Sequence, residues 1–96
     1  MVSKNQIKLI TSLQQKKYRK QEQLFFAEGV KVVQELLASN FVLEHLFETE
    51  VIFEQVPIFQ KTLIKEADMN RITALSSAST CLAIFVGLCP TYFRNV

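Results

Sequence analysis

The stretch of residues 24–37 constrains the fold of this 96-residue chain more than any other. It opens with the apolar residues 24–27, two of which are Phe, and this composition predicts a buried strand. Gly29 then marks a sharp turn. Apolar residues recur at helical spacing over residues 30–37. A strand that turns at a glycine directly into a helix is typical of α/β folds.

Helical and strand patterns alternate along the rest of the chain. Ser3 and Gln6 form a capping box that predicts a helix start. Because residues 14–23 are almost wholly polar, we expect this helix to break within residues 13–17 and a short exposed helical turn to follow. Further elements are expected as a strand at 24–28, a helix at 30–39 capped by Asn40, a strand at 41–49, a short helical turn at 50–55, a strand at 58–64 after Pro57, a helix at 66–76 and a strand at 81–86. The order predicts an α/β sandwich with helices on both faces of a small mixed sheet.

The same periodicities predict which side chains face the core. The wholly apolar strand at 81–86 should be central in the sheet, with Cys81 as a reduced core residue. Alternation would place Leu43, His45 and Phe47 on one side of their strand. The inward-facing helical residues are expected to be Val30, Val33, Leu36, Leu37, Met69, Ile72 and Leu75.

Positive charge is concentrated in the first third of the chain. Residues 1–31 carry seven Lys and Arg against two Glu, a net charge of +5, whereas residues 32–96 carry a net charge of −3. This asymmetry indicates an acidic partner for the N-terminal part.

Several classes of site and protein are disfavoured by the sequence. Two Cys make no disulfide framework, and the lone His45 has no Cys or His partner at zinc-ligand spacing. The N-terminus has no hydrophobic signal region, and the longest apolar run, residues 81–89, is far shorter than a membrane span. We therefore expect a soluble cytoplasmic protein with no metal site and no catalytic constellation.

The basic cluster at residues 16–20 adjoins the predicted strand. Its lysines could be solvated surface or point charges for phosphates, and Arg19 would add a planar fork for bidentate contacts. Tyr18 either stacks on an unpaired base or covers the preceding helix. Gly29 is expected to serve either the backbone conformation of the turn or a close approach to its backbone. Glu28 either contacts a ligand directly or has a structural role at the helix start, paired with Arg19 or Lys31.

Two segments carry a family resemblance. The segments S-K-N-Q-I-K-L-I-T-S-L-Q-Q-K-K-Y-R-K and L-F-F-A-E-G-V-K-V-V-Q-E-L-L resemble the N-terminal substrate-binding domain of SpoU-type (TrmH-type) RNA ribose 2′-O-methyltransferases. That domain has a basic helix ending K-K-x-R, an apolar strand and then E-G-x-K-x-V. The later E-A-D-M-N-R-I-T-A-L-S-S and C-L-A-I-F-V are similar to its last helix and strand, so the resemblance covers residues 2–86.

The resemblance implies a three-layer α/β/α domain with a mixed four-stranded sheet, like the kink-turn-binding ribosomal proteins. Residues 1–87 would bind structured RNA, rRNA or tRNA, and residues 88–96 would be a tail or the start of a linker. The turn at Glu28 and Gly29 would face RNA, with the basic cluster beside it. The implied RNA-binding residues are Lys4, Lys8, Lys16, Lys17, Tyr18, Arg19, Lys20 and Lys31.

Two departures from the family pattern qualify the expected activity. Residues 77–80 read Ser-Ala-Ser-Thr where the family carries Thr-Pro. The family's knotted catalytic domain, which binds S-adenosylmethionine, has no counterpart here, so no methyl transfer is expected from these 96 residues alone. The partners would be RNA and the chain's own C-terminal methyltransferase domain, with no membrane, and the fragment would be a monomer. A stand-alone RNA-binding module and a protein-interaction domain with an acidic partner are the alternatives.

Overall fold

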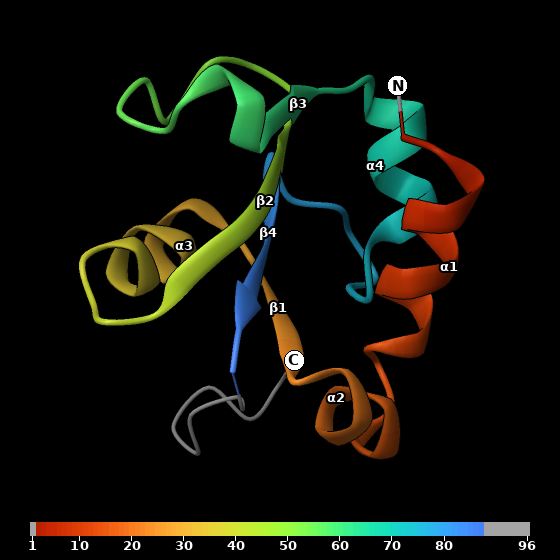
Figure 1. The fold of residues 1–96 in the computed structure, drawn as a ribbon. Coiled ribbons are helices and arrows are strands. Elements are labelled where there is room, and N and C mark those ends of the chain that lie inside the picture. Colours follow the sequence, from red (N-terminus) through yellow and green to blue (C-terminus); the bar gives the residue numbers. More distant parts are fainter. Residues whose placement is uncertain (1, 88–96) are drawn as a thin grey trace.

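A four-stranded sheet forms the middle layer of the computed structural model, which describes residues 2–87 (Figure 1). Its spatial order is β1-β4-β2-β3, so the apolar β4 is an inner strand, as predicted. β4 is antiparallel to both neighbours, whereas β3 pairs in parallel with β2. The strands are β1 (Leu24–Glu28), β2 (Val42–Glu48), β3 (Lys61–Leu63) and β4 (Cys81–Val86).

Helices cover both faces of this sheet. α1 (Lys4–Ser12) and α4 (Glu66–Ile72) pack side by side on one face, and α3 (Val30–Leu37) covers the other (Figure 1). The short α2 (Lys16–Glu22) follows α1 and lies at the start of β1. This arrangement confirms the predicted three-layer α/β/α sandwich and the predicted break after the first helix.

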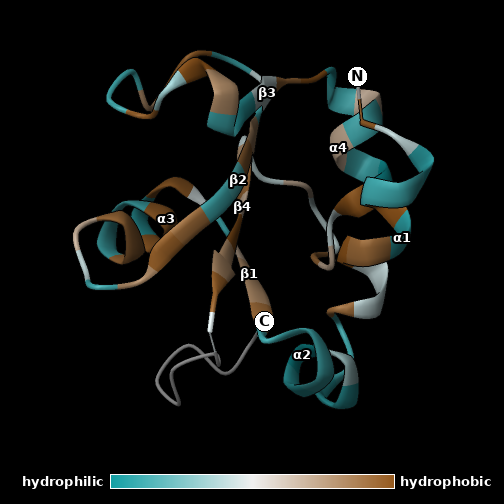
Figure 2. Ribbon diagram, viewed as in Figure 1, coloured by the Kyte–Doolittle hydropathy of each residue, from teal (hydrophilic) through white to brown (hydrophobic). Residues whose placement is uncertain are grey.

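Two apolar clusters fill the spaces between the layers, because alternate residues of the strands point to opposite faces. β1 and β4 are mostly apolar and β2 has a hydrophilic section, whereas α2 is mostly hydrophilic (Figure 2). On the α1 and α4 side the cluster includes Ile10, Leu13, Phe26, Phe47, Met69, Ile72, Leu82 and Ile84. On the α3 side it includes Phe25, Ala27, Val33, Leu36, Leu46, Cys81, Ala83 and Phe85.

A β-bulge in β2 overturns the predicted alternation along that strand. The register with β4 shifts between Leu43 and His45, so Glu44 is an extra residue without a partner of its own. Leu43 consequently joins the α3-side cluster with Leu46, whereas Phe47 faces the opposite layer. The prediction that Leu43 and Phe47 share a face was therefore wrong.

Two helix ends also differ from the periodic pattern. α3 ends at Leu37 and its cap, Ala38, has right-handed backbone angles, so Asn40 is not the left-handed cap that was predicted. Val30, in the first turn of α3, is 39% exposed rather than inward-facing. α4 ends at Ile72 because the backbone becomes extended at the next residue, and Leu75 is left 41% exposed.

The segment between β2 and β3 is less regular than predicted. Residues 50–55 form no helix, and the predicted strand at 58–64 begins instead with a 3₁₀ turn, η1 (Ile58–Gln60). Pro57 explains this start, since its carbonyl accepts the N–H of Gln60 and closes the turn. The proposed tail, residues 88–96 with Tyr92 and Phe93, lies outside the described residues. No helix in residues 2–87 has the length and apolar character needed to cross a membrane.

Cys81 is in the core, as predicted, and His45 lies partly buried on β2. Cys81 is a free, buried cysteine, and burial is the main reason that the pKa of its thiol is raised to about 11. His45 is half-buried, with Nε2 2.7 Å from Oγ1 of Thr62 and its ring centroid 5.0 Å from that of Phe47. Burial lowers the pKa of His45, with Glu44 acting in the opposite direction.

Candidate functional site

The elbow between α1 and α2 positions the basic cluster. A capping box at Ser3 starts α1, and the chain turns over residues 13–15 before α2 begins. Nη1 of Arg19, in α2, donates a hydrogen bond of 2.9 Å to the carbonyl oxygen of Leu13, at the end of α1. The bond satisfies a carbonyl that the helix end would otherwise leave without a partner, and it fixes α2 relative to α1.

The other end of α2 is tied to the sheet. Gln23 caps α2 in the left-handed conformation, at φ 57°, and its amide nitrogen Nε2 donates to the carbonyl of Lys20. The Gln23 carbonyl in turn accepts the N–H of Gly87, at 2.7 Å, directly after β4. α2 is thus held at both ends although none of its residues is buried.

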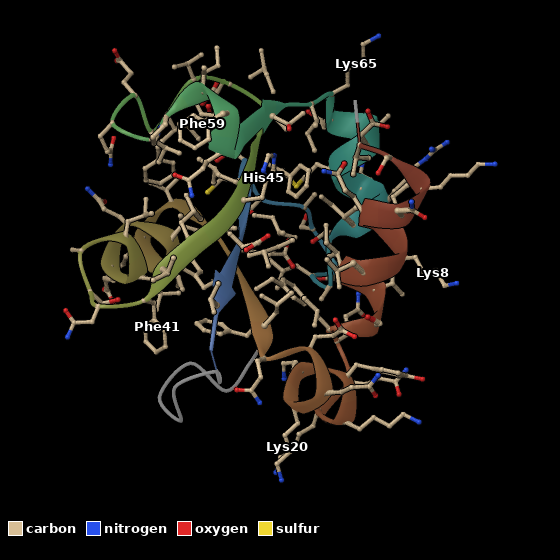
Figure 3. The ribbon with its side chains drawn as sticks, in the orientation of Figure 1. Lys8, Lys20, Phe41, His45, Phe59 and Lys65 are labelled. Carbon is tan, nitrogen blue, oxygen red and sulfur yellow. The ribbon has the colours of Figure 1, made fainter. Side chains whose placement is uncertain are left out.

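The cations of α1 and α2, together with Tyr18, form the feature that we call the α1–α2 basic surface, and all five of its lysines are exposed. Lys8 and Lys20 point into solvent from the outer side of the two helices (Figure 3). Only one acid, Glu22, lies in either helix. The surface comprises Lys4, Lys8, Lys16, Lys17, Tyr18, Arg19 and Lys20.

None of these cations is paired with a carboxylate. Within residues 2–87 the single ion pair joins Lys61 to Glu48, on β3 and β2. Lys16 and Lys20 are four residues apart in one helix, a like-charge spacing that costs a few tenths of a kcal/mol. The surface therefore gains no stability from its own charges, and an anionic ligand would relieve their repulsion.

Tyr18 lies within this surface and is half-buried. Nζ of Lys17 is 4.9 Å from the centroid of its ring, which is within the range of a cation–π contact. Stacking of Tyr18 on a base stays a prediction, and it would require a base to share or replace the Lys17 contact.

The turn at Glu28 and Gly29 lies away from the cations of α2, contrary to expectation. α2 adjoins the Leu24 end of β1, and the turn follows the Glu28 end, about 13 Å away at roughly 3.3 Å per strand residue. Lys31, exposed in the first turn of α3, belongs to this second location. The predicted site residues thus form one group of seven and one separate lysine.

Glu28 has a structural role, although not with the predicted partners. Its carboxylate is buried and accepts hydrogen bonds from the Thr73 hydroxyl at 2.5 Å and from the Ala74 N–H at 2.8 Å. It therefore holds the chain that leaves α4 and pairs with neither Arg19 nor Lys31. Gly29 adopts φ +101°, which L side chains rarely adopt, so the predicted backbone role is confirmed.

Two hollows lie outside the predicted site residues. Sequence reasoning missed both, because each is assembled from segments distant in the chain. A polar hollow of about 250 Å³ lies beside the loop of residues 76–80 and is also lined by Thr49, Glu66 and Asn70. A larger groove of about 510 Å³ is lined by Gln34, Leu37, Ala38, Phe41, Leu43, Gln55, Val56, Pro57 and Gln60. No group of three or more His, Cys, Asp or Glu residues in the described part of the chain could hold a metal ion.

Comparison with known proteins links this fold to one family. Residues 4–83 match the profile of the MRM3-like substrate binding domain. The structure is similar to a protein of the TrmH family of RNA methyltransferases from Porphyromonas gingivalis, with a TM-score of 0.79 and 32% sequence identity over 90% of this chain and 36% of that chain. No curated protein sequence matches the chain.

Two further solved structures share the fold. An AdoMet-bound rRNA methyltransferase from Sinorhizobium meliloti is 26% identical, with a TM-score of 0.72 over 94% of this chain and 37% of that chain. An RNA 2′-O ribose methyltransferase, 16% identical, has a TM-score of 0.70 over 90% of this chain and 36% of that chain. The chain therefore spans little more than a third of the length of these proteins.

Proposed function

Because the chain belongs to the MRM3-like substrate-binding domain family, we propose that its α1–α2 basic surface binds structured RNA for a ribose 2′-O-methyltransferase. One observation carries this proposal: the cations of α1 and α2 have no carboxylate partner, and their lysines are exposed. The bond between Arg19 and Leu13 joins these two helices. Such a set neutralises RNA phosphates and releases their counterions, which makes binding favourable and salt-dependent.

The chemistry of the surface matches a phosphate backbone rather than a small anion. The lysine side chains are exposed and long, so they can follow phosphates at several positions. The elbow presents the two helices at a fixed angle, and shape is the main property by which proteins recognise double-stranded RNA. Arg19 retains free guanidinium N–H groups for a phosphate or a base while Nη1 contacts Leu13.

In this proposal the domain contributes affinity and placement, and methyl transfer takes place in a catalytic domain outside these 96 residues. S-adenosylmethionine would bind that domain and supply the methyl group. The solved Sinorhizobium meliloti relative is an rRNA methyltransferase with AdoMet bound, which supports rRNA as the first substrate to test, with tRNA as the second.

Fluorescence anisotropy with folded rRNA and tRNA fragments tests the proposal. We expect binding at low salt that weakens steeply as salt rises. An acidic polypeptide of similar charge serves as the competitor. Displacement of RNA by that polypeptide at equal charge concentration would favour a protein-interaction domain, and no RNA binding at low salt would refute the proposal.

A further inference from the structure

We propose that the groove beside Phe41 receives an unpaired nucleobase of the RNA that the α1–α2 basic surface holds. The inference rests on the proposed function and adds to it a second contact, made through a base instead of the phosphates. The groove lies on the α3 side of the sheet and includes none of the predicted RNA-binding residues.

The groove lies at the same end of the sheet as α2. β1, β2 and β4 meet there, because Val86 is the register partner of both Leu24 and Val42. The Gly87 N–H donates to the carbonyl of Gln23 at the end of α2. A Cβ built on Gly87 would lie 3.6 Å from the ring of Phe41. Gly87 is therefore the link between the basic helix and the aromatic wall of the groove.

Phe41 is placed to stack on a planar ligand. Its ring packs against Phe25 of the core, with centroids 5.2 Å apart and an interplanar angle of 81°, which fixes its orientation. The side chain nevertheless stays only half-buried and lines the groove. Phe41 and Lys20 both project from the lower part of the molecule in Figure 3. Stacking of unpaired bases on aromatic side chains is a principal mode of single-stranded RNA recognition.

The remaining polar groups of the groove are amides. Gln34 and Gln55 are exposed at its rim, and each offers a donor and an acceptor for a base edge. Nε2 of Gln60 donates to the Leu43 carbonyl at 2.8 Å, which fixes this third amide and leaves its oxygen as an acceptor. The volume of the groove, about 510 Å³, is within the range of small-ligand pockets.

The charge distribution favours a base over other occupants. Among the residues that line the groove none is ionisable, so a phosphate or a metal ion would have no counter-charge there. The positive charges are found instead on the neighbouring α2. A ligand that has phosphates beside a neutral, flat, hydrogen-bonding ring fits both features, and an RNA nucleotide has this composition.

The experiment compares two RNA hairpins with the same paired stem and loop, one fully paired and one with a single additional nucleotide bulged from the stem. The wild-type domain should bind the bulged hairpin more tightly. Phe41→Leu should weaken binding of the bulged hairpin about tenfold through loss of stacking, whereas Phe41→Tyr should retain it. Gln34→Ala should also reduce the preference, and Asn70→Ala, an exposed amide on α4, should not.

These outcomes separate the groove from the basic surface. None of the substitutions changes the charge, so the salt dependence of binding should match the wild type in every variant. Equal binding of both hairpins by the wild-type domain, or an unchanged preference in both Phe41→Leu and Gln34→Ala, would overturn the groove assignment and leave the proposed function standing. Failure of both hairpins to bind at low salt would refute the groove assignment and the proposed function together. Thermal unfolding identifies any variant whose fold is lost, and Gln34→Ala decides the question if Phe41→Leu does not fold.

Discussion

Nη1 of Arg19 lies 2.9 Å from the carbonyl oxygen of Leu13, and this bond joins the two helices that carry the basic surface. Arg19 is therefore the cation of that surface that hydrogen-bonds one helix to the other. Its neighbours Lys16, Lys17 and Lys20 are exposed lysines. The cluster thus separates into one residue that sets the geometry and several that set the charge.

Arg19→Ala should lower the free energy of unfolding by about 1–2 kcal/mol, because a half-buried, charge-assisted hydrogen bond is lost. Lys20→Ala removes the same charge from the same last turn of α2 without removing that bond, and should change stability by less than about 0.5 kcal/mol. Urea denaturation of the two variants measures the difference. Equal stability of the two would mean that the bond to Leu13 contributes nothing to the fold.

Glu28→Ala should destabilise the domain by about 2–3 kcal/mol, since the Thr73 hydroxyl and the Ala74 N–H would both lose a charged acceptor. Thr73→Val removes only one of the two bonds and should cost less. Chemical denaturation gives the ranking. RNA affinity should survive in whatever fraction stays folded, and a selective loss of RNA binding by Glu28→Ala at full stability would instead assign Glu28 a direct ligand contact.

Lys61→Met should cost about 3–5 kcal/mol, because the almost fully buried Glu48 carboxylate would be left without its counter-charge. Glu48 also accepts hydrogen bonds from the N–H groups of Ile52 and Phe53, so Lys61→Met should destabilise the loop after β2 as well. The double variant Glu48→Gln, Lys61→Met restores a neutral site and should recover part of the loss. Thermal unfolding of Lys61→Met, Glu48→Gln and the double variant tests this, and additive losses in the double variant would argue against coupling.

The stability of the domain should fall as the pH decreases below about 6.5. His45 is the only histidine, and burial lowers its pKa in the folded state from the usual 6.5. The unfolded chain therefore binds a proton before the folded domain does, and acidification favours unfolding. Denaturation between pH 5.5 and pH 7.5 should show this slope in the parent and a smaller slope in His45→Gln. If the parent instead became more stable on acidification over this range, the assigned direction of the His45 pKa shift would be wrong.

The layers of the fold follow from the sequence because their periodicities are strong. The apolar run of β4 predicts an inner strand, and the sequence from β1 through Gly29 into α3 predicts a strand that turns directly into a helix. The structure has both features. The bulge at Glu44 could not be predicted from the sequence, since the local pattern of apolar and polar residues does not show which residue of a strand is the extra one. The end of α4 was missed for a related reason: Thr73 leaves the helix to bond Glu28, which is 45 residues away in the chain.

The candidate site was predictable to the extent that it is local in sequence. The four residues of α2 in the α1–α2 basic surface lie on one short helix, and the bond between Arg19 and Leu13 joins that helix to α1, which carries Lys4 and Lys8. Lys31 was grouped with them because it follows them closely in sequence, yet β1 carries it to the opposite end of the sheet. The groove at Phe41 combines α3, β2 and the segment before β3, so no single stretch could indicate it. Cytoplasmic location stays a prediction.

The salt dependence of RNA binding by a Lys16→Gln, Lys17→Gln, Lys20→Gln variant tests the central proposal most directly. Lys65→Gln, an exposed lysine that projects from the opposite end of the molecule in Figure 3, is the single-charge control. If the three lysines contact phosphates, the slope of log K against log salt should become shallower by roughly 2–3, at about 0.7–0.9 per contact, and the control should match the parent. A triple variant with the affinity and the slope of the parent would contradict the assignment of RNA binding to this surface.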